Sequence, residues 1–127
     1  MFEETTQASQ SSSLAGSSSG RMRMLTSALF DSLVLQGKGP IAVEFMSYGC
    51  AHCRAIEPIL QRVAEMVKGK EKIFQVNVAV EPRLAESFEI QGTPTFVMFL
   101  NGQEAGRAEG TPPIVSSVLT AVTQPFE

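Results

Sequence analysis

The chain has 127 residues, of which 43% are hydrophobic and 18% are charged, a composition typical of one globular domain with its own core. The net charge of −3, without a marked cluster of Lys and Arg, argues against nucleic-acid and anionic-membrane binders. No apolar run approaches the roughly 20 residues that a membrane-spanning helix needs. We therefore expect neither nucleic acid nor a membrane among the partners.

The first twenty residues, MFEETTQASQSSSLAGSSSG, are rich in Ser and contain few large apolar side chains. They have neither the basic start nor the apolar stretch of a secretory signal. Because such a segment cannot bury enough surface to offset its ordering entropy, we predict a disordered tail at 1–20 and a folded domain at 21–127. The absence of an export signal favours a cytoplasmic protein, although a mature exported form would have the same composition.

The next elements follow from the spacing of apolar residues. LTSALFDSLVLQG predicts a helix that is capped by Thr26 and stopped at Gly37. PIAVEFM is a short apolar run between turn residues, which is typical of a buried strand. From Cys50 to Lys68 the apolar residues recur at helical spacing, and Gly69 ends the pattern.

The second half of the chain alternates in the same way. KIFQVNVAV predicts a strand, and Pro82 suits the first position of a short helix. PTFVMFL, a turn at Asn101-Gly102 and QEAGRAEG predict a hairpin, and Thr111-Pro112 cap a last helix. This order predicts an α/β fold with a mixed sheet of four to five strands and about four helices on its two faces. Chemistry is then expected at the carboxyl ends of the parallel strands.

At one such end lies Cys50-Ala51-His52-Cys53, which holds both cysteines and the only histidine of the chain. Cysteines at i and i+3 on the first helical turn share one face, close enough to form a disulfide. At a helix N-terminus the backbone amides and the macrodipole favour a thiolate, and a protonated His52 adds a second positive influence. We predict Cys50 as the nucleophile and Cys53 as the resolving thiol.

Other readings of this motif remain open. The cysteines can be inert core residues, and His52 can be a solvated residue of a helix face. A zinc site would need a fourth ligand from a second subunit, because the motif supplies only three. Haem attachment is excluded, since Arg54 follows Cys53 where a histidine is required. We expect no metal, and no cofactor other than a redox-active Cys50–Cys53 disulfide.

Over roughly residues 22–124 the chain resembles the thioredoxin family. PIAVEFMSYGCAHCRAIEPIL is similar to the family's central strand, active-site turn and helix, with Pro58 at the helix-kinking proline. IQGTPTFVMFLNGQE resembles the cis-proline loop and hairpin, and Gly110 fits a turn of the family. The resemblance implies a thioredoxin fold, a cis-proline at Pro94 and a monomer.

The resemblance also implies how substrate binds. Thr93 and Pro94 would face the disulfide and bind extended substrate by strand-like hydrogen bonds, with Gly49 and Ala51 in contact beside Cys50. Without the resemblance, the segment before this strand would be an ordinary turn.

Glu44 is the one charge inside an apolar strand, where the family has a buried Asp that exchanges a proton with the resolving cysteine. We predict Glu44 as general acid and base for Cys53; the alternative is a strand-edge carboxylate that reaches solvent. The family's partner lysine in the next strand is replaced by Gln75, which weakens this analogy.

The active site departs from the usual Trp-Cys-Gly-Pro-Cys. The chain has no Trp, and Met46 stands at the position of the family's other tryptophan. His52 in place of the proline, and Thr93 before Pro94, are similar to protein disulfide isomerases. Because His52 stabilises the Cys50 thiolate, we expect a reduction potential above thioredoxin's value of about −270 mV.

The predicted function is therefore that of a thiol–disulfide oxidoreductase acting on protein disulfides and recycled by a reductase-like or other redox partner. The alternatives are a disulfide isomerase or oxidase, and a non-catalytic binding or metal-carrier protein.

Overall fold

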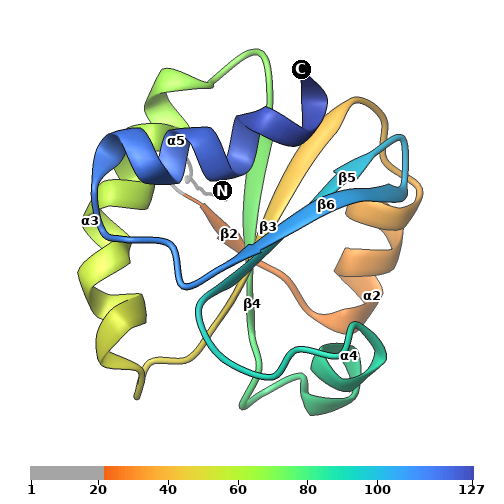
Figure 1. Ribbon diagram of the computed structural model, residues 1–127. Helices are drawn as coiled ribbons and strands as arrows, with labels where there is room; N and C mark the ends of the chain where they lie inside the picture. Colours follow the sequence, from red (N-terminus) through yellow and green to blue (C-terminus); the bar gives the residue numbers. More distant parts are fainter. Residues whose placement is uncertain (1–21) are drawn as a thin grey trace, which may run out of the picture.

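The computed structural model describes residues 22–127, so the predicted tail at 1–20 lies outside the described residues (Figure 1). A five-stranded mixed sheet in the order β2-β4-β3-β5-β6 forms the centre of this region. β2, β4 and β3 run parallel, and β5 and β6 continue the sheet antiparallel. The strands are β2 (Arg23–Met24), β3 (Pro40–Met46), β4 (Lys72–Asn77), β5 (Thr95–Leu100) and β6 (Gln103–Glu109).

Helices cover both faces of the sheet, as the alternating pattern predicts. α3 and α5 lie on one side, and α2 and α4 lie on the other (Figure 1). The helices are α2 (Ser27–Phe30), which continues as the π-helix η1 (Asp31–Leu35), α3 (Ala51–Met66), α4 (Pro82–Ser87), α5 (Val115–Thr123) and the 3-10 turn η2 (Gln124–Phe126). None of the helices within residues 22–127 is long and apolar enough to cross a membrane.

Most predicted helix starts are confirmed. The Thr26 hydroxyl caps α2 by accepting a hydrogen bond from the Leu29 amide at 3.3 Å. Pro82 opens α4. The start predicted at Thr111-Pro112 is wrong, because α5 begins at Val115. Thr111 and Pro112 each precede a proline, which disfavours the helical region for both of them, and α5 begins only after a bend at 113–114.

The strand β2 was not among the elements predicted from the sequence. Its two residues pair with Phe74 and Gln75 of β4, and two residues are too few to show a period. β2 adds the outer parallel strand of the sheet and places Met24 beside Gln75.

The alternation along β3 determines which of its side chains face α3. Ile41, Val43 and Phe45 pack into the cluster beneath α2 and α4. Ala42 packs into the cluster beneath α3 and α5, and Glu44 lies on this same face two residues further on. The strand therefore carries one carboxylate into the layer between the sheet and α3.

Candidate active site

Cys50 lies where the chain turns from β3 into α3. Its amide donates to the Ser47 carbonyl at 3.2 Å, and Cys50 is the N-cap residue of α3. The Cys50 Sγ accepts a hydrogen bond from the Cys53 amide at 3.1 Å. A cap residue leaves the first turn of a helix with free amides, and here sulfur takes the place of the usual side-chain oxygen.

The loop before β5 lies opposite Cys50. The Thr93–Pro94 peptide bond is cis, as the resemblance implies, and the Cys50 thiol donates to the Thr93 carbonyl at 3.4 Å. The Thr95 hydroxyl holds this loop by donating to the Gly92 carbonyl at 2.7 Å. Two segments that are 43 residues apart in the chain thus meet at one sulfur atom.

The two thiols are free and have opposite pKa shifts. Burial would raise the pKa of Cys50, but side-chain hydrogen bonds with Cys53 and Thr93 and the backbone amides of Cys53 and His52 outweigh it and lower that pKa. Burial, followed by the hydrogen bond with Cys50, raises the pKa of Cys53 to about 11. Cys53 is 2% exposed, so the more acidic thiol is also the more accessible one.

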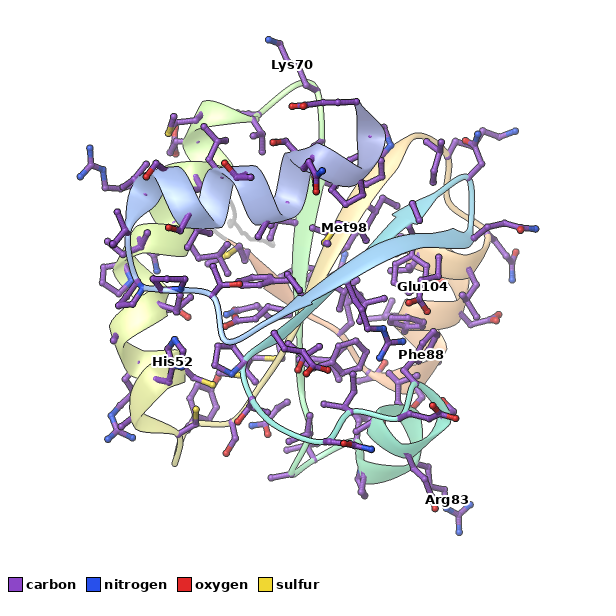
Figure 2. The ribbon with its side chains drawn as sticks, viewed as in Figure 1. His52, Lys70, Arg83, Phe88, Met98 and Glu104 are labelled. Atoms are coloured by element: carbon purple, nitrogen blue, oxygen red, sulfur yellow. The ribbon has the colours of Figure 1, made fainter. Side chains whose placement is uncertain are left out.

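The His52 ring does not contribute to the cysteine pair by a hydrogen bond. Its Nε2 lies 2.7 Å from the Thr111 carbonyl, in the segment that leads from β6 to α5 (Figure 2). A carbonyl only accepts, so Nε2 carries a hydrogen here. The contribution of His52 to the lowered pKa of Cys50 comes through its backbone amide.

Glu44 is completely buried, which excludes the alternative of a strand-edge carboxylate in solvent. Its Oε1 accepts from Gln75 Nε2 at 2.8 Å, and its Oε2 has no hydrogen-bond partner. Burial raises the pKa of Glu44 to about 7; the hydrogen bond from Gln75 opposes this shift, and the charge of Glu57 adds to it. A carboxyl group with this pKa can exchange protons near neutral pH.

The comparisons with known proteins agree with this geometry. The family model named Thioredoxin matches residues 21–120. The chain belongs to the thioredoxin family. The resemblance drawn from the sequence is thereby confirmed at the level of the family.

Three relatives show how far the match extends. Thioredoxin 1 of Nostoc sp. is 30% identical over 89 residues, which are 70% of this chain and 83% of the relative. Thioredoxin M5, chloroplastic, of Oryza sativa subsp. japonica is 36% identical over 84 residues, or 66% of this chain and 49% of the relative. Protein disulfide-isomerase 2-3 of Arabidopsis thaliana is 36% identical over 93 residues, 73% of this chain and 21% of the relative. The chain thus spans about half the length of the rice thioredoxin that it matches.

The remaining predicted residues lie beside the cysteines of this thioredoxin-family chain. Gly49 and Ala51 are exposed on either side of Cys50. Met46, which replaces a family tryptophan, is 4% exposed and lines a groove of about 190 Å³ together with five others. The others are Ser47, Tyr48, Cys53, Arg54 and Glu57. This groove gives the buried side of the site, where Cys53 lies, an opening to the surface.

Glu57 is the residue that sequence reasoning missed. Its Oε1 accepts a second hydrogen bond from Gln75 Nε2, at 2.9 Å. The spacing indicates that Glu57 lies on the same face of the helix as Cys53, because positions i and i+4 share a face and Glu57 follows Cys53 by one turn. Only the contact with Gln75 of β4, 18 residues further on, reveals what Glu57 faces.

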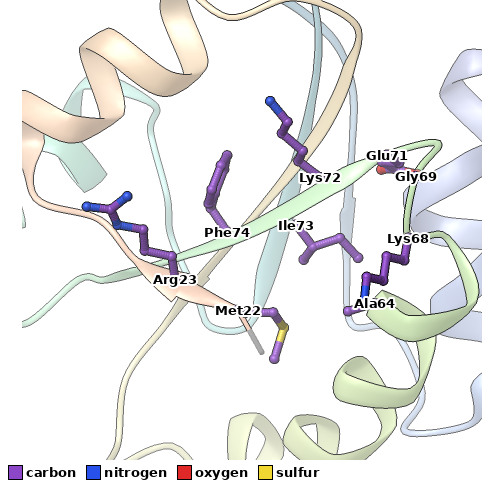
Figure 3. Close-up of a pocket in the computed structure, with 9 residues that line it drawn as sticks. All are labelled: Met22, Arg23, Ala64, Lys68, Gly69, Glu71, Lys72, Ile73 and Phe74. Atoms are coloured by element: carbon purple, nitrogen blue, oxygen red, sulfur yellow. The ribbon is translucent and has the colours of Figure 1, made fainter. Parts of the chain in front are cut away.

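The larger grooves lie away from the cysteines. One of about 270 Å³ is lined by Lys68, Glu71 and Lys72 together with residues of β2 and β4 (Figure 3). A neighbouring groove adds Lys38 and Lys70, so the fold gathers all four lysines at the end where β3 and β4 begin. Three of these lysines, Lys68, Lys70 and Lys72, already lie within five residues of the sequence, and the fold adds Lys38 from the loop before β3.

Metal ligands were not expected. Within the described residues there is no group of three or more His, Cys, Asp or Glu side chains placed to hold a metal ion. The absence of a metal and of a cofactor stays a prediction.

Proposed function

We propose that the protein is a thiol–disulfide oxidoreductase that reduces or exchanges disulfides of protein substrates. The observation that carries this proposal is the Cys50 thiol, which caps α3, has a lowered pKa and lies one turn from a second, buried thiol. A thiolate is the attacking species in thiol–disulfide exchange, so this arrangement supports Cys50 as the nucleophile.

The reaction has two exchange steps. The Cys50 thiolate attacks one sulfur of the substrate disulfide, which forms a mixed disulfide and releases the other substrate sulfur as a thiolate. Glu44 then accepts the proton of Cys53, and the Cys53 thiolate attacks the Cys50 sulfur. The products are a reduced substrate and the Cys50–Cys53 disulfide, and a reductase or another dithiol partner returns the protein to the dithiol state.

The cis-proline loop is proposed as the docking edge for the substrate. Thr93 and Pro94 precede β5, the Thr93 carbonyl contacts Cys50, and Gly49 and Ala51 are exposed next to Cys50 in the chain. An extended substrate strand could align its backbone with Thr93 in the manner of strand addition. This places the scissile disulfide at Cys50 and not at the buried Cys53.

A trapping experiment tests the proposed function. A Cys53→Ser variant can form the mixed disulfide but cannot resolve it, so we expect adducts with cellular proteins that reductant releases. The matched control is Cys50→Ser, which should trap nothing. Should Cys53→Ser trap nothing either under mild oxidation, a non-catalytic thioredoxin-fold protein becomes the better description.

We further propose that the pair is more oxidising than ordinary thioredoxin. A lowered pKa of Cys50 stabilises the dithiol state, and this makes the disulfide a stronger oxidant. Equilibration of the pair in glutathione buffers measures the potential. A value near thioredoxin's, about −270 mV, would contradict the proposal.

A disulfide isomerase or oxidase is the second candidate. It is favoured by the similarity to a relative named protein disulfide-isomerase, which shares 36% identity over 93 residues. Refolding of a scrambled multi-disulfide protein distinguishes the two, because an isomerase restores activity without net reduction of the substrate.

We also propose a cellular location for the protein. We place the protein in the cytosol, while two relatives that are chloroplastic by name make a plastid the second candidate. Imaging of the full chain fused to a fluorescent protein separates the two.

A further inference from the structure

One row of side chains across the sheet carries two polar groups among apolar neighbours. Gln75 of β4 pairs with Met24 on one side and with Glu44 on the other, and Glu44 pairs with Phe96. Gln75 and Glu44 are 5% and 0% exposed. The row faces α3, from which Glu57 reaches it.

The Gln75 amide joins two carboxylates. Its Nε2 donates to Glu44 Oε1 at 2.8 Å and to Glu57 Oε1 at 2.9 Å. Carboxylate oxygens are acceptors, so the amide nitrogen must face them, and both of its hydrogens are used. One carboxylate is therefore enclosed in the core, and the other is half-buried at the groove beside Cys53.

We propose that Glu57 is a positioning residue that controls the protonation of Glu44 across the shared Gln75 amide, and thereby the pH at which Cys53 resolves the mixed disulfide. The inference rests on the proposed function, in which Glu44 accepts the proton of Cys53. Two like charges at one site disfavour each other, so the charge of Glu57 adds to the burial that favours the protonated form of Glu44.

The proton balance of the step is simple. The Cys53 thiol gives its proton to the Glu44 carboxylate, and the electron pair left on sulfur forms the bond to Cys50. The substrate sulfur leaves as a thiolate and takes a proton from solvent. Glu44 then releases its proton, and the groove that Cys53 and Glu57 line is the nearby opening.

The groups around the carboxylate pair come from four elements. α3 contributes Cys53 and Arg54 at the groove, and Arg54 Nη1 is engaged with the Tyr48 carbonyl at 2.9 Å. Gln61 of α3 donates to Glu57 Oε2 at 3.2 Å.

The strands of the described region contribute no further charge to this group. β4 contributes the neutral Gln75, and the residues of the row on β2 and β5 are apolar. Glu57 is therefore the charge that acts most directly on Glu44, in agreement with its contribution to the raised pKa of Glu44.

The decisive variant is Glu57→Gln, which keeps an oxygen for the Gln75 amide and removes the charge. We expect the titration midpoint of Glu44, followed by carboxyl carbon NMR in the reduced protein, to fall by about one pH unit. Stopped-flow reaction with an aromatic disulfide reports resolution by Cys53 as its second phase. The rise of that rate with pH should move to lower pH by the same amount, and Glu57→Asp should keep the wild-type profile.

The matched control is Glu65→Gln, which removes a charge from an exposed position of the same helix and should leave both midpoints unchanged. If Glu57→Gln behaves like this control while Glu44→Gln alters the second phase, the inference about Glu57 is overturned and the proposed function stands. If Glu44→Gln leaves the second phase unchanged, Glu44 does not accept the proton of Cys53. Glu57 then cannot control Cys53 through Glu44, and the inference is overturned as well. A protein that shows no second phase at all would contradict the oxidoreductase itself.

Discussion

The two thiols, separated by two residues, have pKa values that are shifted in opposite directions. The pKa of Cys50 is lowered, and burial, followed by the hydrogen bond with Cys50, raises the pKa of Cys53 to about 11. The direction of this difference could be predicted from the sequence, because Cys50 begins a helix. The place of Thr93 beside the sulfur is implied by the family resemblance, whereas the hydrogen bond from the Cys50 thiol to its carbonyl is seen only in the fold. The same holds for Glu57, whose partner lies on another element.

His52 offers a test that separates charge from structure at one residue. Its ring donates to the Thr111 carbonyl, and a glutamine amide can make a similar bond without carrying a positive charge. A positively charged His52 ring that raises the potential requires His52→Gln to lower it toward thioredoxin's value, whereas a contribution through the His52 backbone amide alone leaves it unchanged. In both cases the amide keeps the bond to Thr111 and with it the melting temperature. His52→Ala should lower both, because it also loses the link to Thr111. The potential is read in glutathione buffers and the melting temperature by circular dichroism.

The outcome that would contradict this prediction is a potential that neither substitution changes. The oxidising character would then come from the backbone amides at the start of α3 alone. A drop in melting temperature for both variants would show that the segment at Thr111 is stabilised by the shape of the imidazole ring and not by the hydrogen bond alone.

At the scale of elements, pattern and structure agree where an element is long and periodic. β3, α3 and the β5–β6 hairpin lie where their apolar spacing places them. They disagree where a contact between residues far apart in the chain determines whether an element forms or where it begins. β2 exists because it pairs with β4, and the start of α5 is delayed by a second proline while Thr111 is tied to His52.

The turn at Asn101-Gly102 needs a left-handed backbone and space for it. Both residues have positive φ, 52° and 84°, and a Cβ on Gly102 would collide with the Leu35 carbonyl at the end of η1. We expect Gly102→Ala to reduce the free energy of unfolding by about 2 kcal/mol, because the residue is strained and clashes with backbone. Urea denaturation measures the loss. The matched control is Gly92→Ala, where no atom lies within 4 Å of an added Cβ, and equal stability of the two variants would refute the prediction.

At the scale of the whole molecule, the buried carboxylate makes stability depend on pH. The pKa of Glu44 rises from 4.5 in the unfolded chain to about 7 in the fold, so the folded state binds more protons between these values. The free energy of unfolding contributed by this residue therefore falls as pH rises from about 4.5 to 7, by about 3 kcal/mol in total.

The corresponding variant is Glu44→Gln, which keeps an acceptor for Gln75 and cannot ionise. We expect it to be more stable than the wild type at pH 8 and similar at pH 4, as measured by urea denaturation at both pH values. Burial also raises the pKa of Glu71 to about 7, but Glu71 is present in both proteins and cancels in the difference. A stability difference that is the same at both pH values would show that Glu44 does not titrate in this range.

The sulfur that we propose as the nucleophile is also the atom that caps α3. In the proposed reaction the Cys50 Sγ changes from a thiolate to a disulfide sulfur when it bonds to a substrate, and a disulfide sulfur is a much weaker acceptor for the Cys53 amide. The first turn of α3 then loses part of its capping, and its amide protons should exchange faster with solvent in the covalent complex than in the dithiol protein. We therefore expect the proposed catalytic cycle to be accompanied by a local loosening and tightening of one helical turn, which amide exchange at Cys53 would follow directly.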